Sequence, residues 1–273
     1  MRAPSALELR TQIGAPLHAP GDSEVVLRDP DGAPCAYGSK DEADYHIHFP
    51  GVADFRFRPG GHEVVAHARA ATEVVEDLFR TTVVPLALQA SGYEALHASA
   101  VQVETGIAAL CGYSGSGKST VAYGLSRRGY PLWGDDAVVF DVAEDRRIRC
   151  FPIPFALQLR DASRRYFTAS GQDFADAPSA SAELAVVVVL DRVVGRVLRL
   201  ERVSIANAMR ALLPHAYRFT LADPPRARRT IESYLDVIAQ VPVFRARYSP
   251  GFSELPALLD AIESMVTSVP EPT

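Results

Sequence analysis

The most constraining feature of the sequence is the segment GYSGSGKS, which spans Gly112–Ser119 and fits the phosphate-binding pattern G-x-x-x-x-G-K-[ST]. Its glycines permit backbone angles that turn successive N–H groups into one concavity, where they bind phosphate oxygens. The pattern predicts that Lys118 reaches the outer phosphates of ATP and that the Ser119 hydroxyl ligates Mg²⁺. The residues expected to bind the nucleotide are Gly112, Ser114, Gly115, Ser116, Gly117, Lys118, Ser119 and Thr120.

The flanks of this segment supply the structural context that the motif requires. The apolar run GIAALC at 106–111 is typical of a buried strand. The segment after Lys118 has apolar residues at helical spacing and ends at Gly129, a common helix stop. A strand, a glycine loop and a helix in this order predict a nucleotide-binding α/β fold.

Composition excludes several classes of protein. The chain has 273 residues, which predicts one large domain or two small ones. The net charge is −5 and there is no Lys- or Arg-rich block, so neither nucleic acid nor a membrane surface is an expected partner. No apolar run has the length of a membrane span or the form of a signal peptide, and three cysteines are too few for a disulfide framework or a zinc site. We expect a cytoplasmic protein, and the sequence leaves homo-oligomerisation open.

Residues 1–90 are expected to form a small antiparallel β-rich unit with a linking helix. Strand-like runs occur at 24–29, 44–49, 53–58 and 62–68, and turn signals rich in Pro, Gly and Asp separate them. A helical pattern begins at Thr72, and Pro85 should kink or divide that helix.

Residues 91–268 are expected to form the nucleotide-binding core. The expected strands span 95–103, 106–111, 131–142, 146–151, 184–190 and 196–202, followed by VFRARY near the C-terminus. The loop at 170–182 is expected to carry function and to bind an acceptor, as loops over a rigid scaffold often do. Residues 269–273 read as a disordered tail.

The pair Asp135–Asp136 follows the loop at the spacing of a neighbouring strand. In a phosphate-loop fold an acid at such a strand end meets Mg²⁺. A second acid has another use, because a carboxylate can take a proton from a hydroxyl nucleophile. The residues alone allow either acid to play either part.

His97 lies on the strand that leads into the loop strand. A lone histidine in a strand is more often a half-buried structural residue than a catalytic one. Here it could lie beside Asp135 and tune or orient that carboxylate.

The run from Leu96 to Asp141 resembles the catalytic core of the HPr kinase/phosphorylase family. It resembles more closely the HPr-kinase-like proteins of peptide-modification gene clusters, such as lasso-peptide kinases. The resemblance rests on His97, the loop ending in G-K-S, the helix closing in R-R-G and the paired acids. It implies an α/β P-loop core with a mixed sheet, similar to that of ATP-dependent phosphoenolpyruvate carboxykinases. It also implies phosphoryl transfer to a hydroxyl, with Asp135 as the catalytic base and Asp136 near Mg²⁺.

The sequence departs from this family in two places. The later signature segment of the HPr kinases is missing, and FPIPFALQLRDASRRYF at 151–167 stands there. The first 90 residues do not resemble the first domain of those kinases, so HPr is not implied as the substrate. Three arginines in the replacing segment either clamp a phosphate or an acidic substrate, or simply face solvent. They are Arg160, Arg164 and Arg165.

The sequence therefore predicts a Mg-ATP-dependent kinase. Its expected catalytic residues are Asp135, His97 and Lys118, and its expected metal ligands are Ser119 and Asp136. The acceptor would be a hydroxyl, as in serine, on a peptide, a small protein or a small molecule. Two alternatives remain, a phosphoenolpyruvate carboxykinase-like enzyme and a nucleotide-binding regulatory protein without transfer activity.

Overall fold

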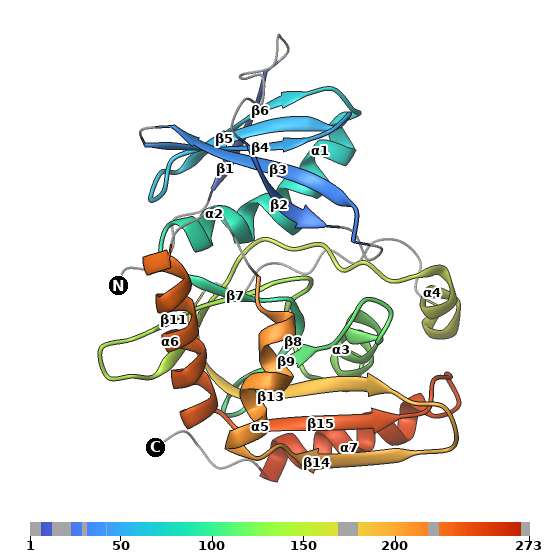
Figure 1. The fold of residues 1–273 in the computed structure, drawn as a ribbon. Coiled ribbons are helices and arrows are strands. Elements are labelled where there is room, and N and C mark those ends of the chain that lie inside the picture. The colour runs from blue at the N-terminus through green and yellow to red at the C-terminus, as the bar shows by residue number, and fades with distance from the viewer. Residues whose placement is uncertain are drawn as a thin grey trace. The chain divides into compact units, whose positions relative to one another are not determined.

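The computed structural model describes residues 7–12, 23–28, 32–41, 43–168, 180–217 and 224–268. The chain divides into two compact units, each drawn in Figure 1. The N-terminal unit comprises Arg2–Tyr93 with Tyr217–Arg229, and the P-loop unit comprises Glu94–Ala216 with Thr230–Thr273. Residues 170–179 of the expected acceptor loop and the expected tail at 269–273 lie outside the described residues. Within the described ranges, no helix combines the length and the apolar character needed to cross a membrane.

The N-terminal unit is built on a six-stranded sheet in the order β1-β6-β5-β4-β3-β2. The strands are β1 (Glu8–Gln12), β2 (Glu24–Arg28), β3 (Pro34–Asp41), β4 (Asp44–Phe49), β5 (Ala53–Phe57) and β6 (Glu63–Ala68). Strands β2 to β6 pair antiparallel in chain order, whereas β1 pairs parallel to β6. The expectation of a wholly antiparallel unit was therefore wrong at β1. A strand that is far from its partner in the chain can join a sheet edge in either direction.

One face of this sheet forms the core of the N-terminal unit. Residues of β4 alternate between buried and half-buried, as strand periodicity predicts, whereas β5 and β6 are buried over three and four consecutive residues. Tyr45 stacks on Phe57 and Phe49 meets Phe55 edge to face, with ring centroids 5.7 and 5.8 Å apart. The helical segment that follows comprises α1 (Thr72–Leu78), a π-helical turn (Phe79–Val83) and α2 (Val84–Ala90). The division falls next to Pro85, which lacks the N–H that a continuous helix needs, as the sequence predicted.

The P-loop unit contains a nine-stranded mixed sheet. Its strands are β7 (Glu94–Leu96), β8 (Ala98–Val103), β9 (Gly106–Cys111), β10 (Leu132–Gly134), β11 (Val138–Val142), β12 (Ile148–Phe151), β13 (Ala182–Arg192), β14 (Leu198–Arg202) and β15 (Val243–Tyr248). The central strand β13 runs parallel to β9 and β15, and the remaining pairs are antiparallel. The expected α/β class with a mixed sheet is thereby confirmed.

Helices cover both faces of this sheet and explain why β13 is apolar along most of its length. On one face lie α3 (Lys118–Ser126) and α7 (Leu255–Ser268), which bury Leu125 and Ile262 against the sheet. On the other lie α5 (Ile205–Leu212) and α6 (Pro224–Gln240), which bury Leu212 and Tyr234. The short helix α4 (Asp161–Phe167) follows β12. Because α3 begins directly after the loop that follows β9, the loop lies at the carboxyl end of the parallel strands (Figure 1).

Two expected strands are each broken in the structure. The expected strand 95–103 is interrupted at His97, whose N–H donates to the carbonyl of His215 at 2.7 Å. The expected strand 131–142 is interrupted after Gly134. Beyond this break Asp136 adopts a φ of +64°, which is uncommon for a residue with a Cβ. His97 and the residues Gly134–Asp136 interrupt the apolar pattern, but such short interruptions also occur within continuous strands, so only the long-range hydrogen bonding reveals the breaks.

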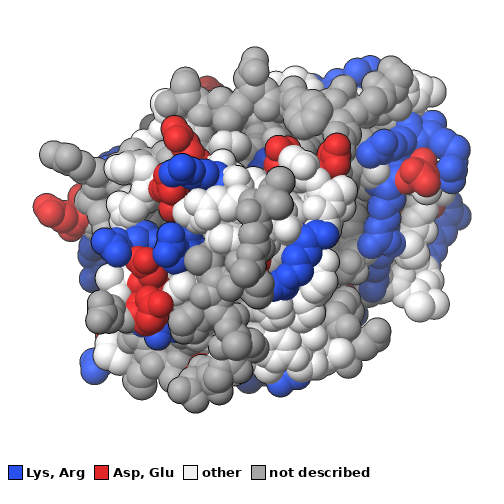
Figure 2. Space-filling view, turned by 90° about the horizontal axis from the view of Figure 1, so that it is seen from above, with Lys and Arg blue, Asp and Glu red and all other residues white. Residues whose placement is uncertain are grey.

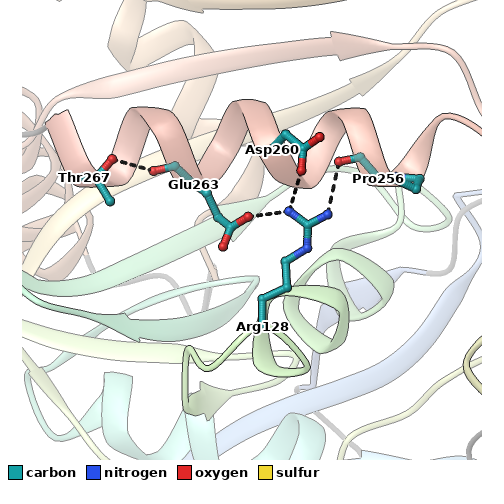
Figure 3. Close-up of polar contacts among 5 residues, drawn as sticks. All are labelled: Arg128, Pro256, Asp260, Glu263 and Thr267. Carbon is teal, nitrogen blue, oxygen red and sulfur yellow. Dashed lines mark hydrogen bonds and ion pairs between the residues drawn. The ribbon is translucent and has the colours of Figure 1, made fainter.

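Arg128 joins the end of α3 to α7 (Figure 3). Its guanidinium donates to Asp260 Oδ1 at 2.7 Å, to the Glu263 carboxylate, and to the Pro256 carbonyl at 3.4 Å. This contact holds together the two helices that cover one face of the sheet.

We expect Arg128→Ala to lower the stability of the P-loop unit by about 1 kcal/mol, since exposed ion pairs of good geometry contribute up to about this amount. The melting temperature should fall by about 2–4 °C. Thermal unfolding followed through Trp133, the one tryptophan of the chain, would measure it. Arg127→Ala is the matched control and should melt like the wild type; equal losses in both variants would contradict a specific role for Arg128.

Candidate functional site

The P-loop, residues 112–119, has a backbone that only glycine fits at two positions. Gly112 has a φ of +153°, and a Cβ there would lie 2.3 Å from Ser116 Oγ. Gly117 has a φ of +92°, and a Cβ there would lie 2.9 Å from the Tyr248 hydroxyl. That hydroxyl donates to the Ser116 carbonyl and so fixes the loop to β15. Ser116 Oγ is buried and has no hydrogen-bond partner among the described residues, as expected of a group that awaits a ligand.

The Lys118 ammonium lies buried inside the loop. It donates to the Gly112 carbonyl at 3.0 Å and to His97 Nε2 at 3.1 Å. Burial lowers the pKa of Lys118, while the nearby charges of Asp136 and Asp135 raise it. The loop therefore holds a pre-positioned cation in a low-dielectric setting, where its field on a phosphate is strong.

The contacts of His97 define which nitrogen carries its proton. His97 Nδ1 lies 3.0 Å from the Asp136 carbonyl, which can only accept, so Nδ1 is the protonated nitrogen and Nε2 accepts from Lys118. Burial, together with the Lys118 charge, lowers the pKa of His97 to about 4. At neutral pH the ring is therefore uncharged. It links the lysine of the loop to the backbone of the acid pair.

Asp135 is buried and accepts three hydrogen bonds. Its carboxylate accepts from Ser99 Oγ at 2.5 Å, from Ser119 Oγ at 3.0 Å and from the Gln158 N–H at 3.1 Å. Burial raises its pKa and the charge of Asp136 raises it further, although the three hydrogen bonds act the other way. A carboxylate of raised pKa accepts a proton more readily than an ordinary aspartate does.

Asp136 has a different environment from its neighbour. It is half-buried, and its backbone is in the left-handed region, which places its side chain apart from the line of the strand. Its charge acts on both Lys118 and Asp135. The two acids and the lysine expected from the sequence are thus brought together in one place.

Sequence reasoning missed His215, which arrives from the 3₁₀ turn Leu213–His215. Its ring meets Tyr113 of the loop edge to face, with centroids 5.3 Å apart. Burial, followed by the charge of Lys118, lowers its pKa to about 4. No local motif marks this residue, since it follows the loop by about a hundred residues. Ser99 was missed too, although its position two residues after His97 places it on the same strand side.

Two arginines flank the loop. A Cβ on Gly115 would lie 3.6 Å from one guanidinium nitrogen of Arg160, and a Cβ on Gly117 would lie 3.6 Å from one of Arg192. Of the three arginines singled out in the sequence, Arg160 is the one that the structure places against the loop. Beside the loop is a cavity of about 70 Å³. Its lining includes Thr120, Arg192, Tyr248 and Phe252.

The residues present fit a nucleotide triphosphate with Mg²⁺. The orphaned Ser116 hydroxyl and the buried Lys118 ammonium are suited to phosphate oxygens. The Ser119 hydroxyl and the Asp135 carboxylate, 3.0 Å apart, offer the oxygen donors that Mg²⁺ prefers. Among the described residues, there is no group of three His, Cys, Asp or Glu side chains that could hold a metal ion. Mg²⁺ in phosphate sites usually takes only one or two carboxylates, with substrate phosphates and water.

Comparisons with known proteins add little to this geometry. No protein-family model and no curated protein matches the sequence. Among solved structures, one similar chain is the HPr(Ser) kinase/phosphatase from Coxiella burnetii. The match covers 63% of this chain and 89% of that one, at 12% identity and a TM-score of 0.34. At this TM-score the likeness carries no weight, so function has to follow from the site itself.

The lowered pKa of His215 predicts a pH-dependent loss of stability. The unfolded chain takes up a proton on this histidine near pH 6.5, whereas the folded chain does so only near pH 4. Between these values the unfolded state binds more protons, so the stability that this group supplies is complete above pH 6.5 and lost as the pH falls toward 4.

We expect His215→Asn to flatten the fall in melting temperature over this range, as followed through Trp133 fluorescence. His62→Asn, at an exposed histidine of the N-terminal unit, should keep the wild-type slope. An unchanged slope in His215→Asn would show that His215 is not the group responsible.

Proposed function

We propose that the protein is a Mg-ATP-dependent kinase that transfers a phosphoryl group to a hydroxyl, such as that of serine. The acceptor would be a peptide, a small protein or a small molecule, and the setting the cytoplasm. The observation that carries the proposal is the pair of acids Asp135 and Asp136, whose charges both act on the buried Lys118 of the P-loop. One carboxylate suffices for Mg²⁺, so the second is available to accept a proton, and a protein that only binds nucleotide does not require it.

The chain's own residues supply the parts of such a transfer. Loop N–H groups and Lys118 would hold the phosphates, and Arg160 and Arg192 would offset charge that develops on them. Mg²⁺, held on the side of Ser119 and the acid pair, would neutralise phosphate charge. The acceptor oxygen forms a bond to the terminal phosphorus, the bond to the ADP oxygen breaks, and the acceptor proton passes to a carboxylate.

The roles of the two acids can be argued from their environments. The raised pKa of Asp135 favours it as the base, which leaves Asp136 for the metal. The bond from Ser119 to Asp135 favours the opposite assignment, since Ser119 is itself an expected metal ligand. We propose the first assignment because proton transfer needs a basic carboxylate, and the variants below separate the two.

His97 would act as a positioning residue. It holds the Asp136 backbone through Nδ1 and receives the Lys118 ammonium at Nε2. A ring whose pKa is about 4 stays neutral at working pH and does not compete with the acids for the acceptor proton.

Replacing Lys118 by Ala should reduce turnover at least about 10²-fold, in line with the loss of one pre-positioned electrostatic contact. The measurement is acceptor-dependent ADP release at saturating Mg-ATP, with serine-containing peptides as acceptors. Arg127→Ala removes a positive charge just beyond the C-terminal end of the same helix and serves as the control. Near-normal turnover in Lys118→Ala would mean that the P-loop is not the phosphate site of the reaction.

Asp135→Asn should keep Mg-ATP affinity within a few-fold and lose transfer by roughly 10²–10⁴-fold, the usual contribution of a positioned base. Asp136→Asn should weaken Mg²⁺ dependence and turnover together. Binding of a fluorescent ATP analogue over a Mg²⁺ titration, and transfer of labelled phosphate, would measure both effects. Asp145→Asn, at an exposed acid, is the control.

The outcomes of this pair separate the competing functions. If the two phenotypes are exchanged, the roles of the acids are exchanged and the kinase stands. Wild-type transfer by both variants would remove the kinase proposal. ATP binding without acceptor-dependent turnover in the wild type would favour a regulatory nucleotide-binding protein, whereas turnover of phosphoenolpyruvate or oxaloacetate would favour a carboxykinase.

A further inference from the structure

A second polar pocket lies in the P-loop unit, away from the P-loop. It has a volume of about 480 Å³ and is lined by residues of β14, β15, α5 and the connection between β14 and α5. The lining residues are Glu201, Arg202, Val203, Ser204, Asn207, Arg210 and Arg245. The protein has a net charge of −5, yet this pocket collects three guanidinium groups against one carboxylate. Figure 2 shows Lys and Arg side chains gathered at one side of the face displayed.

The arginines of this pocket are not used by the fold. Within the described ranges, Arg202, Arg210 and Arg245 form neither an ion pair nor a side-chain hydrogen bond. The one acid of the pocket, Glu201, is already engaged by Arg199 at 2.9 Å, outside the pocket. The guanidinium of a structural arginine commonly donates to a carboxylate or a carbonyl, as that of Arg128 does. Three guanidinium groups without a partner among the described residues line one pocket, which indicates a site for an anionic group.

The backbone at the pocket adds to the same preference. Ser204 precedes α5 and makes no side-chain cap, and its carbonyl accepts from Asn207 and Ala208 at 2.9 Å. The N–H groups of Ile205 and Ala206 have no partner within the helix, and its N-terminal end favours negative charge.

The surroundings indicate a peptide rather than a small free anion. Ile205, the first residue of α5, is 66% exposed beside the pocket residue Ser204, and Leu198 on β14 is 44% exposed. Strand β14 pairs only with β15 among the described strands, so its outer edge can receive an extended chain. Guanidinium groups together with exposed apolar side chains and a strand edge match a peptide that carries both acidic and apolar side chains.

We propose that this pocket binds an acidic segment of a peptide or protein, with a carboxylate held by Arg202, Arg210 and Arg245. The further proposal that this peptide is the phosphoryl acceptor rests on the proposed kinase function. The binding of an acidic peptide at the pocket is independent of that function.

The distance from the P-loop is compatible with docking of an acceptor. Arg245 precedes Tyr248 by three residues on β15, and the Tyr248 hydroxyl contacts the P-loop. Three strand residues span about 10 Å. An acceptor could therefore carry its acidic side chain some three to five extended residues from the hydroxyl that is phosphorylated.

The test is binding of a fluorescein-labelled peptide of six glutamates and one leucine, measured by fluorescence anisotropy on the full chain. A saturating non-hydrolysable ATP analogue with Mg²⁺ keeps the P-loop occupied, so that the loop cannot capture the probe. The double variant Arg210→Gln/Arg245→Gln should bind at least about tenfold more weakly, since two charge-assisted contacts are lost. The double variant Arg196→Gln/Arg247→Gln removes the same charge from the same unit and should stay within about twofold of the wild type. Arg210→Lys keeps the positive charge but loses the planar guanidinium that binds a carboxylate through two N–H groups, and its loss of peptide affinity should be intermediate.

Three outcomes would overturn the proposal. These are no binding to the wild type, equal losses in both double variants, and full displacement of the peptide by millimolar inorganic phosphate, which would mark a site for small anions. The readout needs no catalysis, so it is independent of the kinase assays. Peptide binding without acceptor phosphorylation would contradict the kinase proposal and leave the peptide site standing. Phosphorylation at the wild-type rate in the pocket variants would contradict the pocket's role as the acceptor's docking site and leave the kinase standing.

Discussion

A buried ammonium sets the electrostatics of the P-loop unit. Lys118 bonds to the Gly112 carbonyl and to His97, and so it closes the loop on itself. A buried cation is costly without compensation, and here neutral and negative groups surround the ammonium, although the charge of Arg160 acts against it. The two histidines near it are held uncharged, each with a pKa of about 4. The charges of Asp136 and Asp135 stabilise it from the other side.

The same arrangement connects the loop to the acid pair through a short chain of polar contacts. His97 bridges Lys118 to the Asp136 backbone, while Ser119 bridges the start of α3 to Asp135. Both bridges depend on breaks in regular strands, at His97 and after Gly134. Departures from regular geometry at such places are expected where function, rather than stability, determines the backbone.

These observations show which parts of the site could be predicted from the sequence. The P-loop is a local motif, and Asp135 and Asp136 are adjacent in the chain, so the residues themselves indicate them. His215 and Arg192 reach the site only through the path of the chain between β13 and α6, which no short pattern records. The breaks at His97 and after Gly134 were missed because a short polar interruption of an apolar run is also compatible with a continuous strand. In the N-terminal unit neither β1 nor β3 was among the expected strands, and the parallel pairing of β1 with β6 was missed because the two are distant in sequence.

Helix α5 gives the P-loop unit a further internal connection. Its residues Asn207 and Arg210 line the arginine pocket, and the helix runs into the segment Leu213–His215, which contacts Tyr113 and the backbone of His97. The helix has eight residues and so spans about 12 Å. A rigid element of this length fixes the separation between the pocket and the P-loop. An acceptor anchored at one end would therefore present its hydroxyl at a defined distance, and binding energy gained far from the reacting atoms would then serve to position them.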